Sequence, residues 1–203
     1  MTQVRAYVDG FNLYHGLRQD GRRHLWLDLE GLATSLLKPG QHLDRVRYFT
    51  ARVRNDPPGK QRQADCLDAL LAHSSRLEVI EGRFQQKTRS CSRCRREWIT
   101  YEEKETDVSI AVALVEDGVL DHFDTALVIS ADSDLCPAIR SLKRLRPTKR
   151  VIAAFPPNRR SDDLRLAVDA AFTIGAAKIR QAQLPASVLT KAGIKLVRPT
   201  HWC

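Results

Sequence analysis

Short apolar runs alternate along the chain with longer segments whose apolar residues recur every three or four positions. A short run bounded by turn residues is typical of a buried strand, and the longer period is typical of an amphipathic helix. The pattern predicts strands at 4–9, 46–53, 77–84, 127–129, 150–155 and 171–174. It predicts helices at 11–17, 25–37, 61–74, 104–115, 136–143 and 176–181, with Asp28 and Ser161 as candidate helix caps.

Strands that alternate with helices of this length predict one α/β domain, in which helices cover both faces of a mainly parallel sheet. The chain has 203 residues, enough for a single domain with a substantial core. We expect this domain over residues 1–183, with a hairpin-like insertion at about 85–101. Residues 184–203 are expected to form a tail that packs on the domain through Trp202.

Aspartates stand at the ends of two predicted strands and at the start of one predicted helix. Asp9 ends the first strand, Asp132 and Asp134 follow the fourth strand, and Asp107 opens the fourth helix. Because parallel strands end at one edge of a sheet, Asp9, Asp132 and Asp134 are expected at one edge, where open α/β sheets bind ligands. A βα unit would bring the start of the fourth helix, and Asp107 with it, to the same edge. Carboxylates gathered there favour a divalent cation. Each aspartate also has a purely structural interpretation, as a turn residue, a helix cap or a charge that favours the helix dipole.

The chain carries more basic than acidic side chains, with 33 Lys and Arg against 24 Asp and Glu, a net charge of +9 and a pI near 9.6. This balance favours nucleic acid as a partner ahead of an anionic membrane surface, although a solvated basic surface gives the same count. The sequence lacks a long apolar span and an opening signal pattern, so we expect a cytoplasmic protein with no membrane partner. The basic residues group at Arg45/Arg47/Arg52/Arg54, Arg89/Arg93/Arg95/Arg96 and Arg140/Lys143/Arg144/Arg146/Lys149/Arg150.

Five cysteines, an odd number, favour reduced thiols or a metal site over a set of disulfides. Cys91 and Cys94 form a Cys-x-x-Cys pair in the basic insertion, which is half of a tetrahedral Zn²⁺ site. His201 and Cys203 in the tail, or a second subunit, would supply the other two ligands. A pair of free thiols is the alternative, so a structural Zn²⁺ stays one of two hypotheses.

The chain resembles the NYN family of PIN-like domains, of the bacterial type, over about residues 3–180. The resemblance rests on three motifs in the expected order: Val8-Asp9-Gly10-Phe11-Asn12-Leu13-Tyr14, Lys104-Glu105-Thr106-Asp107-Val108 and Ser130-Ala131-Asp132-Ser133-Asp134. It implies a PIN-like three-layer α/β/α sandwich and a ribonuclease whose acidic cluster binds Mg²⁺ or Mn²⁺. Carried over by position, it gives catalytic and metal-binding roles to Asp9, Asp107, Asp132 and Asp134, and it matches polar motif positions to Asn12, Ser130 and Lys104.

The expected function is therefore a metal-dependent endoribonuclease that hydrolyses phosphodiester bonds in single-stranded RNA. In this hypothesis, Asp9, Asp107 and Asp132 bind the metal directly or through water, and Asp134 completes the cluster or positions the attacking water. Asn12 and Ser130 would orient water or a phosphate oxygen, and Lys104 would contact phosphate. RNA is expected along the basic insertion, with phosphates held by Arg93, Arg95 and Arg96 and a base stacked on Trp98, although Trp98 also fits a packing role.

Two other functions are compatible with the sequence. An RNA-binding adaptor would keep the acidic pocket with little or no nuclease turnover. A phosphohydrolase of the haloacid dehalogenase type also carries Asp-x-Asp after a strand, but it normally has this motif on the first strand, where Phe11 here stands two positions after Asp9. The sequence leaves the oligomeric state open, with a homodimer as one of its options.

Overall fold

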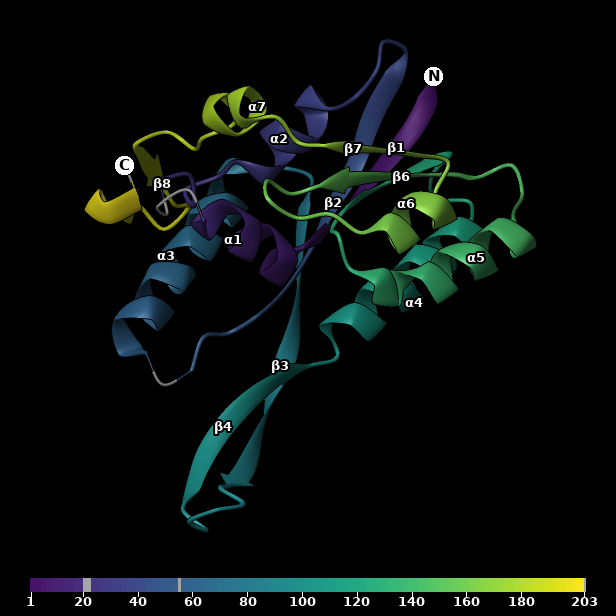
Figure 1. Cartoon of the computed structure of the whole chain (residues 1–203). Coiled ribbons are helices and arrows are strands. Elements are labelled where there is room, and N and C mark those ends of the chain that lie inside the picture. The colour runs from purple at the N-terminus through teal and green to yellow at the C-terminus, as the bar shows by residue number, and fades with distance from the viewer. Residues whose placement is uncertain (20–22, 55, 203) are drawn as a thin grey trace.

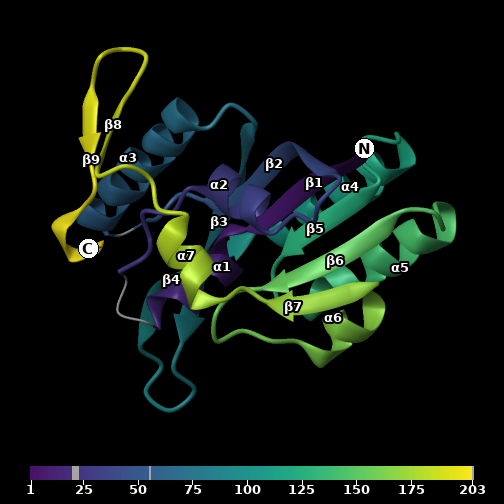
Figure 2. The same cartoon turned by 90° about the horizontal axis from the view of Figure 1, so that it is seen from above.

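The computed structural model describes residues 1–19, 23–54 and 56–202, and its centre is a seven-stranded sheet (Figure 1). Its strands are β1 (Thr2–Asp9), β2 (Gln41–Ala51), β3 (Leu77–Ser90), β4 (Glu97–Lys104), β5 (Thr125–Ile129), β6 (Arg150–Phe155) and β7 (Ala170–Thr173). They follow the order β4-β3-β2-β1-β5-β6-β7, and Figure 2 shows β2, β1, β5, β6 and β7 side by side in this order. All neighbours are parallel except β3 and β4, which confirms the predicted mainly parallel sheet.

The helices are α1 (Gly10–Arg18), α2 (Leu29–Ser35), α3 (Pro57–His73), α4 (Thr106–Val119), α5 (Cys136–Leu145), α6 (Asp162–Ala167) and α7 (Ala176–Gln181). They cover both faces of the sheet. Val4, Ala6 and Val8 of β1 join one core with residues of α1, α2, α3 and α7, whereas Tyr7 joins a second core with residues of α4, α5 and α6. Successive residues of a strand point to opposite faces, so β1 is buried from both sides. This arrangement confirms the three-layer α/β/α sandwich.

The strand order reverses at β1. The chain builds β2 and β3 on one side of β1 and returns to build β5, β6 and β7 on the other side. Open α/β sheets bind ligands beyond the carboxyl ends of the strands at such a reversal. The last pair in the register of β1 and β5 is Val8 with Ile129, so Asp9 and Ser130 come next at the same edge.

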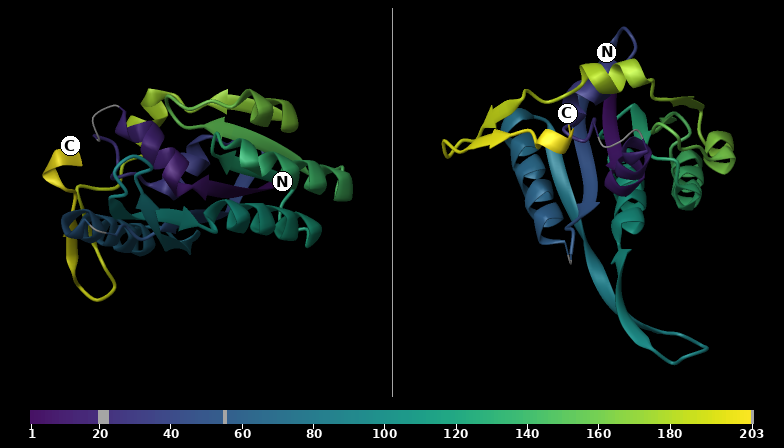
Figure 3. Two further views of the ribbon diagram at one scale, coloured as in Figure 1. Left: turned by 60° about the horizontal axis from the view of Figure 1, so that its bottom comes forward. Right: turned by 60° about the vertical axis from the view of Figure 1, so that its left-hand side comes forward.

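Strand β3 continues far beyond the parallel sheet. Leu77–Gly82 pairs with β2, and the residues from Arg83 to Ser90 pair with β4 in an antiparallel hairpin. Figures 1 and 3 show this two-stranded arm projecting from the body of the molecule. The arm carries Cys91 and Cys94 between its strands, as predicted for the insertion. It leaves the sheet at the edge where the parallel strands end, and it leads directly into α4.

Some helix starts agree with the sequence prediction better than others. Asp28 and Ser161 cap α2 and α6, because their side chains accept hydrogen bonds from the backbone N–H groups of Gly31 and Leu164. In contrast, α3 begins at Pro57, four residues before the predicted start at 61. Proline lacks the N–H that a first helical turn leaves unpaired, so it suits this position, and Asp56 caps the helix.

The C-terminal part of the chain forms a second, two-stranded antiparallel sheet of β8 (Ser187–Leu189) and β9 (Lys195–Val197), followed by the short 3₁₀ helix η2 (Thr200–Trp202). Trp202 is buried and joins the core on the side of α1 and α3. The side chain of His201 and all of Cys203 lie outside the described residues. No helix in the described part of the chain is both long and apolar enough to cross a membrane.

Candidate metal centre

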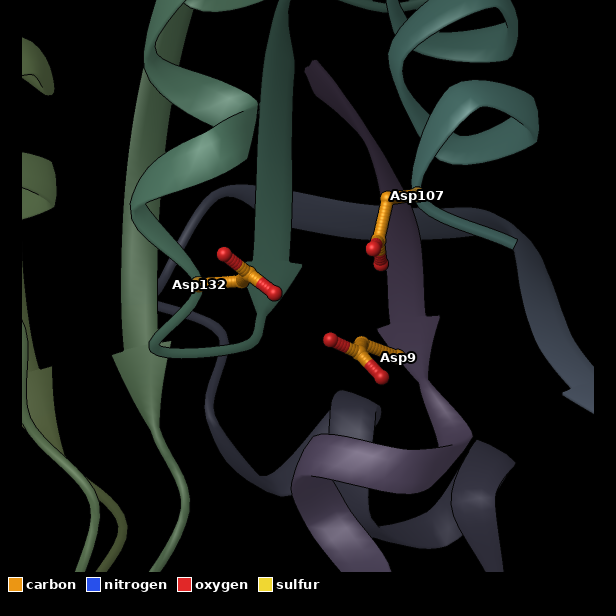
Figure 4. Close-up of side chains that lie close together, drawn as sticks. All are labelled: Asp9, Asp107 and Asp132. Atoms are coloured by element: carbon orange, nitrogen blue, oxygen red, sulfur yellow. The ribbon is translucent and has the colours of Figure 1, made fainter. Parts of the chain in front are cut away.

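Three carboxylates meet at the edge of the sheet where β1 and β5 end. Asp9 is the last residue of β1, Asp132 follows β5, and Asp107 lies in the first turn of α4. One carboxylate oxygen of each lies within 4.8 Å of the others, and Figure 4 shows the three side chains directed toward a common space. The structure therefore brings together three of the four aspartates that the sequence places at one edge.

Asp9 is held by hydrogen bonds to both of its oxygens. Oδ1 accepts the backbone N–H of Asn12 (2.9 Å), which makes Asp9 the N-cap of α1, and Oδ2 accepts the hydroxyl of Ser130 (2.8 Å). The side chain is only 3% exposed. Each carboxylate oxygen has a second lone pair, so these bonds leave acceptor capacity for a cation. The structural and the metal-binding interpretations of Asp9 are therefore compatible with each other.

Ser130 and Asn12 connect the ends of the two central strands. The Ser130 hydroxyl oxygen accepts the backbone N–H of Asp132 (3.0 Å), and Asn12 Oδ1 accepts the backbone N–H of Ala131 (3.1 Å). Both residues are buried, at 0% and 5% exposure. These contacts fix the turn after β5 against the start of α1. The direct role expected for these residues, to orient water or a phosphate oxygen, stays a prediction.

Asp132 and Asp134 differ in position although they stand two residues apart. Asp132 Oδ1 accepts the backbone N–H of Asp134 (2.9 Å) and caps the 3₁₀ turn η1 (Ser133–Leu135), while a carboxylate oxygen of Asp132 belongs to the three-acid cluster. Asp134 is exposed on η1 and is not a member of that cluster. Its catalytic role stays a prediction.

Asp107 reaches the cluster through a sharp turn between β4 and α4. Glu105 adopts a left-handed conformation there, with φ of 79°, and its carboxylate pairs with Arg83 Nε at the base of the arm (2.5 Å). A left-handed conformation is costly for a residue with a side chain. The turn directs the amino end of α4 at the cluster, so the positive end of the helix dipole faces the three acids.

The donor set fits a hard divalent cation. Mg²⁺ and Mn²⁺ prefer oxygen ligands, and Mg²⁺ usually combines one or two carboxylates with several waters. In the absence of a cation the three negative charges repel one another, and burial reduces the screening of Asp9 by water. Across the residues that the structure describes, no other three acidic, histidine or cysteine side chains come together in this way.

The basic residues expected to contact RNA lie along the β3–β4 arm. Arg93, Arg95 and Arg96 are exposed at its tip, and Trp98 is 46% exposed. The side chain of Lys104 lies outside the described residues, so its phosphate contact stays a prediction. In the sequence, Arg89 belongs to the basic group of the insertion, but Lys87 was not predicted to be part of this surface. Lys87 and Arg89 stand two residues apart in a segment predicted to be extended, and this spacing indicates that they share a face.

One face of the arm combines positive charge with an aromatic ring. Lys87 and Arg89 are two residues apart on β3 and so share a face, and Trp98 stands directly opposite Arg89 on β4. These three residues and Ser90 line a shallow hollow. A basic surface with an exposed aromatic ring is typical of single-stranded nucleic acid binding.

The tip of the arm holds the two cysteines in a tight turn. The backbone N–H of Arg95 donates to the carbonyl of Cys91, and the N–H of Cys91 donates to the carbonyl of Arg96, both at 2.9 Å. Arg95 has a positive φ of 53°. The backbone N–H groups of Cys94 and Arg93, together with the Cys94 thiol, are directed at the Cys91 sulfur and lower the pKa of Cys91.

A largely apolar cavity of about 250 Å³ lies between α1, α3 and the end of β2. None of the three clustered aspartates lines it. Burial raises the pKa of the Cys66 thiol to about 12 and also raises the pKa of Tyr48. Both groups are therefore uncharged at physiological pH, and the Cys66 thiol donates to the carbonyl of Leu25 (3.9 Å). The cavity lining includes Tyr14, Leu17, Tyr48, Cys66, Leu67 and Trp202.

Comparison with known proteins places these features in one family. The NYN domain family matches residues 4–196. The chain is 26% identical over 175 residues to 6-hydroxy-3-succinoylpyridine 3-monooxygenase HspA of Pseudomonas putida (strain DSM 28022 / S16), a match that covers 70% of this chain and 55% of that relative. The chain thus spans about half the length of this relative.

Among solved structures, the fold is similar to VPA0982 of Vibrio parahaemolyticus RIMD 2210633, a protein of unknown function. The TM-score is 0.59 at 20% identity, over 86% of this chain and 94% of that chain. This likeness supports the fold alone. The family match covers nearly the whole chain and includes all three motifs that carry the clustered aspartates. The chain therefore belongs to the NYN domain family.

Proposed function

We propose that this protein is a metal-dependent endoribonuclease that hydrolyses phosphodiester bonds in single-stranded RNA. The observation that carries the proposal is the cluster of Asp9, Asp107 and Asp132, with oxygens within 4.8 Å of one another at the strand-order reversal of a NYN domain. The net charge of +9 supports a polyanionic substrate.

Each residue at the proposed metal site has a separate role. When bound, Mg²⁺ or Mn²⁺ activates water and neutralises charge on the phosphate. Asp9, Asp107 and Asp132 would hold the ion directly or through water. Ser130 and Asn12 keep Asp9 and the turn after β5 in place, so little ordering is required on binding. Asp134, exposed beside the cluster, is proposed to position the attacking water.

The products follow from the bond that breaks. The water oxygen bonds to phosphorus, and the 3′ oxygen of the preceding nucleotide leaves and takes up a proton. Cleavage therefore yields a 5′-phosphate on one fragment and a 3′-hydroxyl on the other. The 2′-hydroxyl does not attack the phosphorus in this reaction, so no cyclic phosphate is formed.

The arm supports single-stranded RNA as the substrate. At the base of the arm, Arg83 and Lys104 are opposite each other in the backbone register of β3 and β4. Lys104 is three residues before Asp107, so an RNA strand bound along the arm would lead toward the cluster. Lys87 and Arg89 would hold phosphates, together with Arg93, Arg95 and Arg96 at the tip. Trp98 would stack on an unpaired base, which a duplex does not offer.

The test is a cleavage assay with end-labelled RNA. We expect single-stranded RNA to be cut internally in Mn²⁺ or Mg²⁺, and to stay intact in the presence of a chelator. RNA of the same sequence in a perfect duplex, and single-stranded DNA, serve as matched substrates and should be cut more slowly. Enzymatic labelling of the product ends checks for the 5′-phosphate and the 3′-hydroxyl.

Two results would contradict the proposal in different ways. Salt-sensitive RNA binding with no metal-dependent cleavage would favour the RNA-binding adaptor. Turnover of a small phosphomonoester without RNA cleavage would favour the phosphohydrolase.

The apolar cavity favours a second candidate function, which is the binding of a small aromatic compound. HspA carries the name of a monooxygenase for 6-hydroxy-3-succinoylpyridine, and the cavity here offers aromatic walls and two uncharged side chains, Tyr48 and Cys66. We expect 6-hydroxy-3-succinoylpyridine to change the tryptophan fluorescence in a saturable way, because Trp202 lines the cavity. A Cys66→Leu variant, which fills the cavity, should weaken this binding at least tenfold. Absence of saturable binding to the wild type would exclude this candidate.

A further inference from the structure

The tip of the β3–β4 arm presents half of a metal site. Cys91 and Cys94 flank a two-residue turn, and the Cys94 thiol is directed at the Cys91 sulfur, so both sulfurs face the same point. Two backbone N–H groups of the turn are also directed at the Cys91 sulfur, and hydrogen bonds between Cys91 and residues 95 and 96 hold the turn shut. N–H groups aimed at sulfur stabilise a thiolate, which is the form that binds metal.

The described part of the same chain does not complete this site. The arm pairs over eight residues of each strand, from Arg83 with Lys104 to Ser90 with Glu97. At about 3.3 Å per residue, the tip lies roughly 25 Å beyond the base of the arm. Cys66 and Cys136 are in the body, half-buried on α3 and buried at the start of α5. Figure 3 shows η2, next to the C-terminus, well away from the tip.

A structural Zn²⁺ site is closed by four ligands, and thiolates are among its preferred ligands. A second copy of the chain supplies two more cysteines with the same geometry. A two-fold axis through the tip would bring the two Cys-x-x-Cys turns together, which is the common symmetry of homodimers. The arm projects clear of the body in Figures 1 and 3, so two arms can meet end to end without a clash between the domains.

The charges at the tip make this contact depend on metal. Arg93, Arg95 and Arg96 surround the cysteines and are exposed, so two tips repel each other without a counter-charge. Four thiolates around one Zn²⁺ carry a net charge of −2, which the arginines of both tips offset. Binding releases the thiol protons to solvent and changes no oxidation state.

We propose that one Zn²⁺ joins two copies of this chain tip to tip, bound by Cys91 and Cys94 of each copy. The two arms then form one continuous ribbon, with an acidic cluster beyond each end. The zinc site contains no residue of the acidic cluster, so its test by zinc content and mass does not depend on whether the protein cleaves RNA.

The test measures zinc content and mass in solution, in the presence of a phosphine reductant that excludes disulfides. We expect one Zn²⁺ per two chains and a mass twice the 23.0 kDa of the chain, falling to 23.0 kDa when a strong chelator removes the zinc. The Cys91→Ser/Cys94→Ser variant should contain no zinc and should be monomeric. Ser92→Ala, within the same turn, is the matched control and should behave as the wild type.

A second variant tests the intrachain alternative. His201→Ala/Cys203→Ser should keep the zinc and the dimer, because the tail plays no part in the proposed site. Loss of zinc from this variant, one Zn²⁺ per monomeric chain, or a dimer that persists without zinc would each overturn the proposal. Circular dichroism of the Cys91→Ser/Cys94→Ser variant checks that the domain remains folded.

Discussion

Replacing Asp107 by Asn is expected to abolish metal-dependent RNA cleavage and to remove the stabilisation of the fold by Mn²⁺. Asp107 supplies one of the three clustered oxygens. Metal ions contribute several kcal/mol to such reactions, and each 1.36 kcal/mol is tenfold in rate, so the loss should be about a thousandfold or more. Without metal, the loss of one of three mutually repelling charges opposes the loss of the favourable interaction between Asp107 and the amino end of α4, so the stability should change by no more than about 1 kcal/mol.

Thermal unfolding in a series of Mn²⁺ concentrations separates these effects. At a metal concentration of 100 times Kd, binding adds about 2.7 kcal/mol to the stability of the wild type. For a chain of this length that corresponds to a rise in Tm of about 5–10 °C. Asp107→Asn should show almost no rise. Asp68→Asn, on the exposed side of α3, is the matched control and should behave as the wild type in both assays.

Asp107 is preferred for this test because the N-cap residue of α4 is Glu105 and not Asp107. Asp9 and Asp132 also cap α1 and η1, so their replacement changes local structure together with the metal site. If Asp107→Asn retained cleavage and the Mn²⁺-dependent rise in Tm, the cluster would not be the metal site.

The positions of Asp9 and Asp132 were predictable because they follow from topology, whereas Asp107 reaches the cluster through the turn that follows the antiparallel strand β4. Strands alternate with helices, the sheet is parallel, and residues after β1 and β5 must then reach one edge. The outward position of Asp134 was not predictable, because the two acids are equivalent in sequence until the 3₁₀ turn separates them. The contacts of Ser130 and Asn12 depend on the neighbourhood of β1 and β5, which lie more than 110 residues apart.

The sequence also did not show which basic side chains form ion pairs within the protein. Arg47 belongs to the first basic group, yet in the structure it pairs with Glu78 and Asp117 rather than facing an external partner. Arg52, in the same group, pairs with Glu81. Such pairings depend on which strands are neighbours, and the hydrophobic pattern does not record this. Part of the positive charge of the first basic group is therefore balanced by acidic side chains of neighbouring elements, and the net charge of the chain overstates the charge that could face a nucleic acid.

Replacing Asp117 by Asn is expected to lower the free energy of unfolding by about 3 kcal/mol, without a direct effect on the metal cluster. Asp117 lies in α4 and is 4% exposed. Its carboxylate accepts the Tyr7 hydroxyl (2.7 Å) and pairs with Arg5 (2.9 Å) and Arg47 (3.0 Å). Removing its charge leaves the largely buried guanidinium groups of Arg5 and Arg47 with less negative charge to balance them. The loss is at the low end for a buried pair because Arg5 keeps Asp44 and Arg47 keeps Glu78.

Thermal or urea unfolding measures this change, with an expected fall in Tm of about 6–12 °C. Glu81→Gln is the matched control, because it removes the exposed pair of Glu81 with Arg52 and should cost no more than about 1 kcal/mol. Equal effects of the two substitutions would contradict the assignment of Asp117 as the centre of the buried network.

The same residue should make the stability depend on pH. Burial alone would raise the pKa of Asp117, but the hydrogen bonds from Tyr7 and His122 and the charges of Arg47 and Arg5 together lower it. The ionised carboxylate therefore stabilises the fold above the unfolded-state pKa of about 3.9, and this contribution is lost as the pH falls through the lower folded-state value. Asp117→Asn cannot lose this contribution, so the stability difference between wild type and variant should shrink below about pH 4. A constant difference through this range would show that the Asp117 charge is not what stabilises the network.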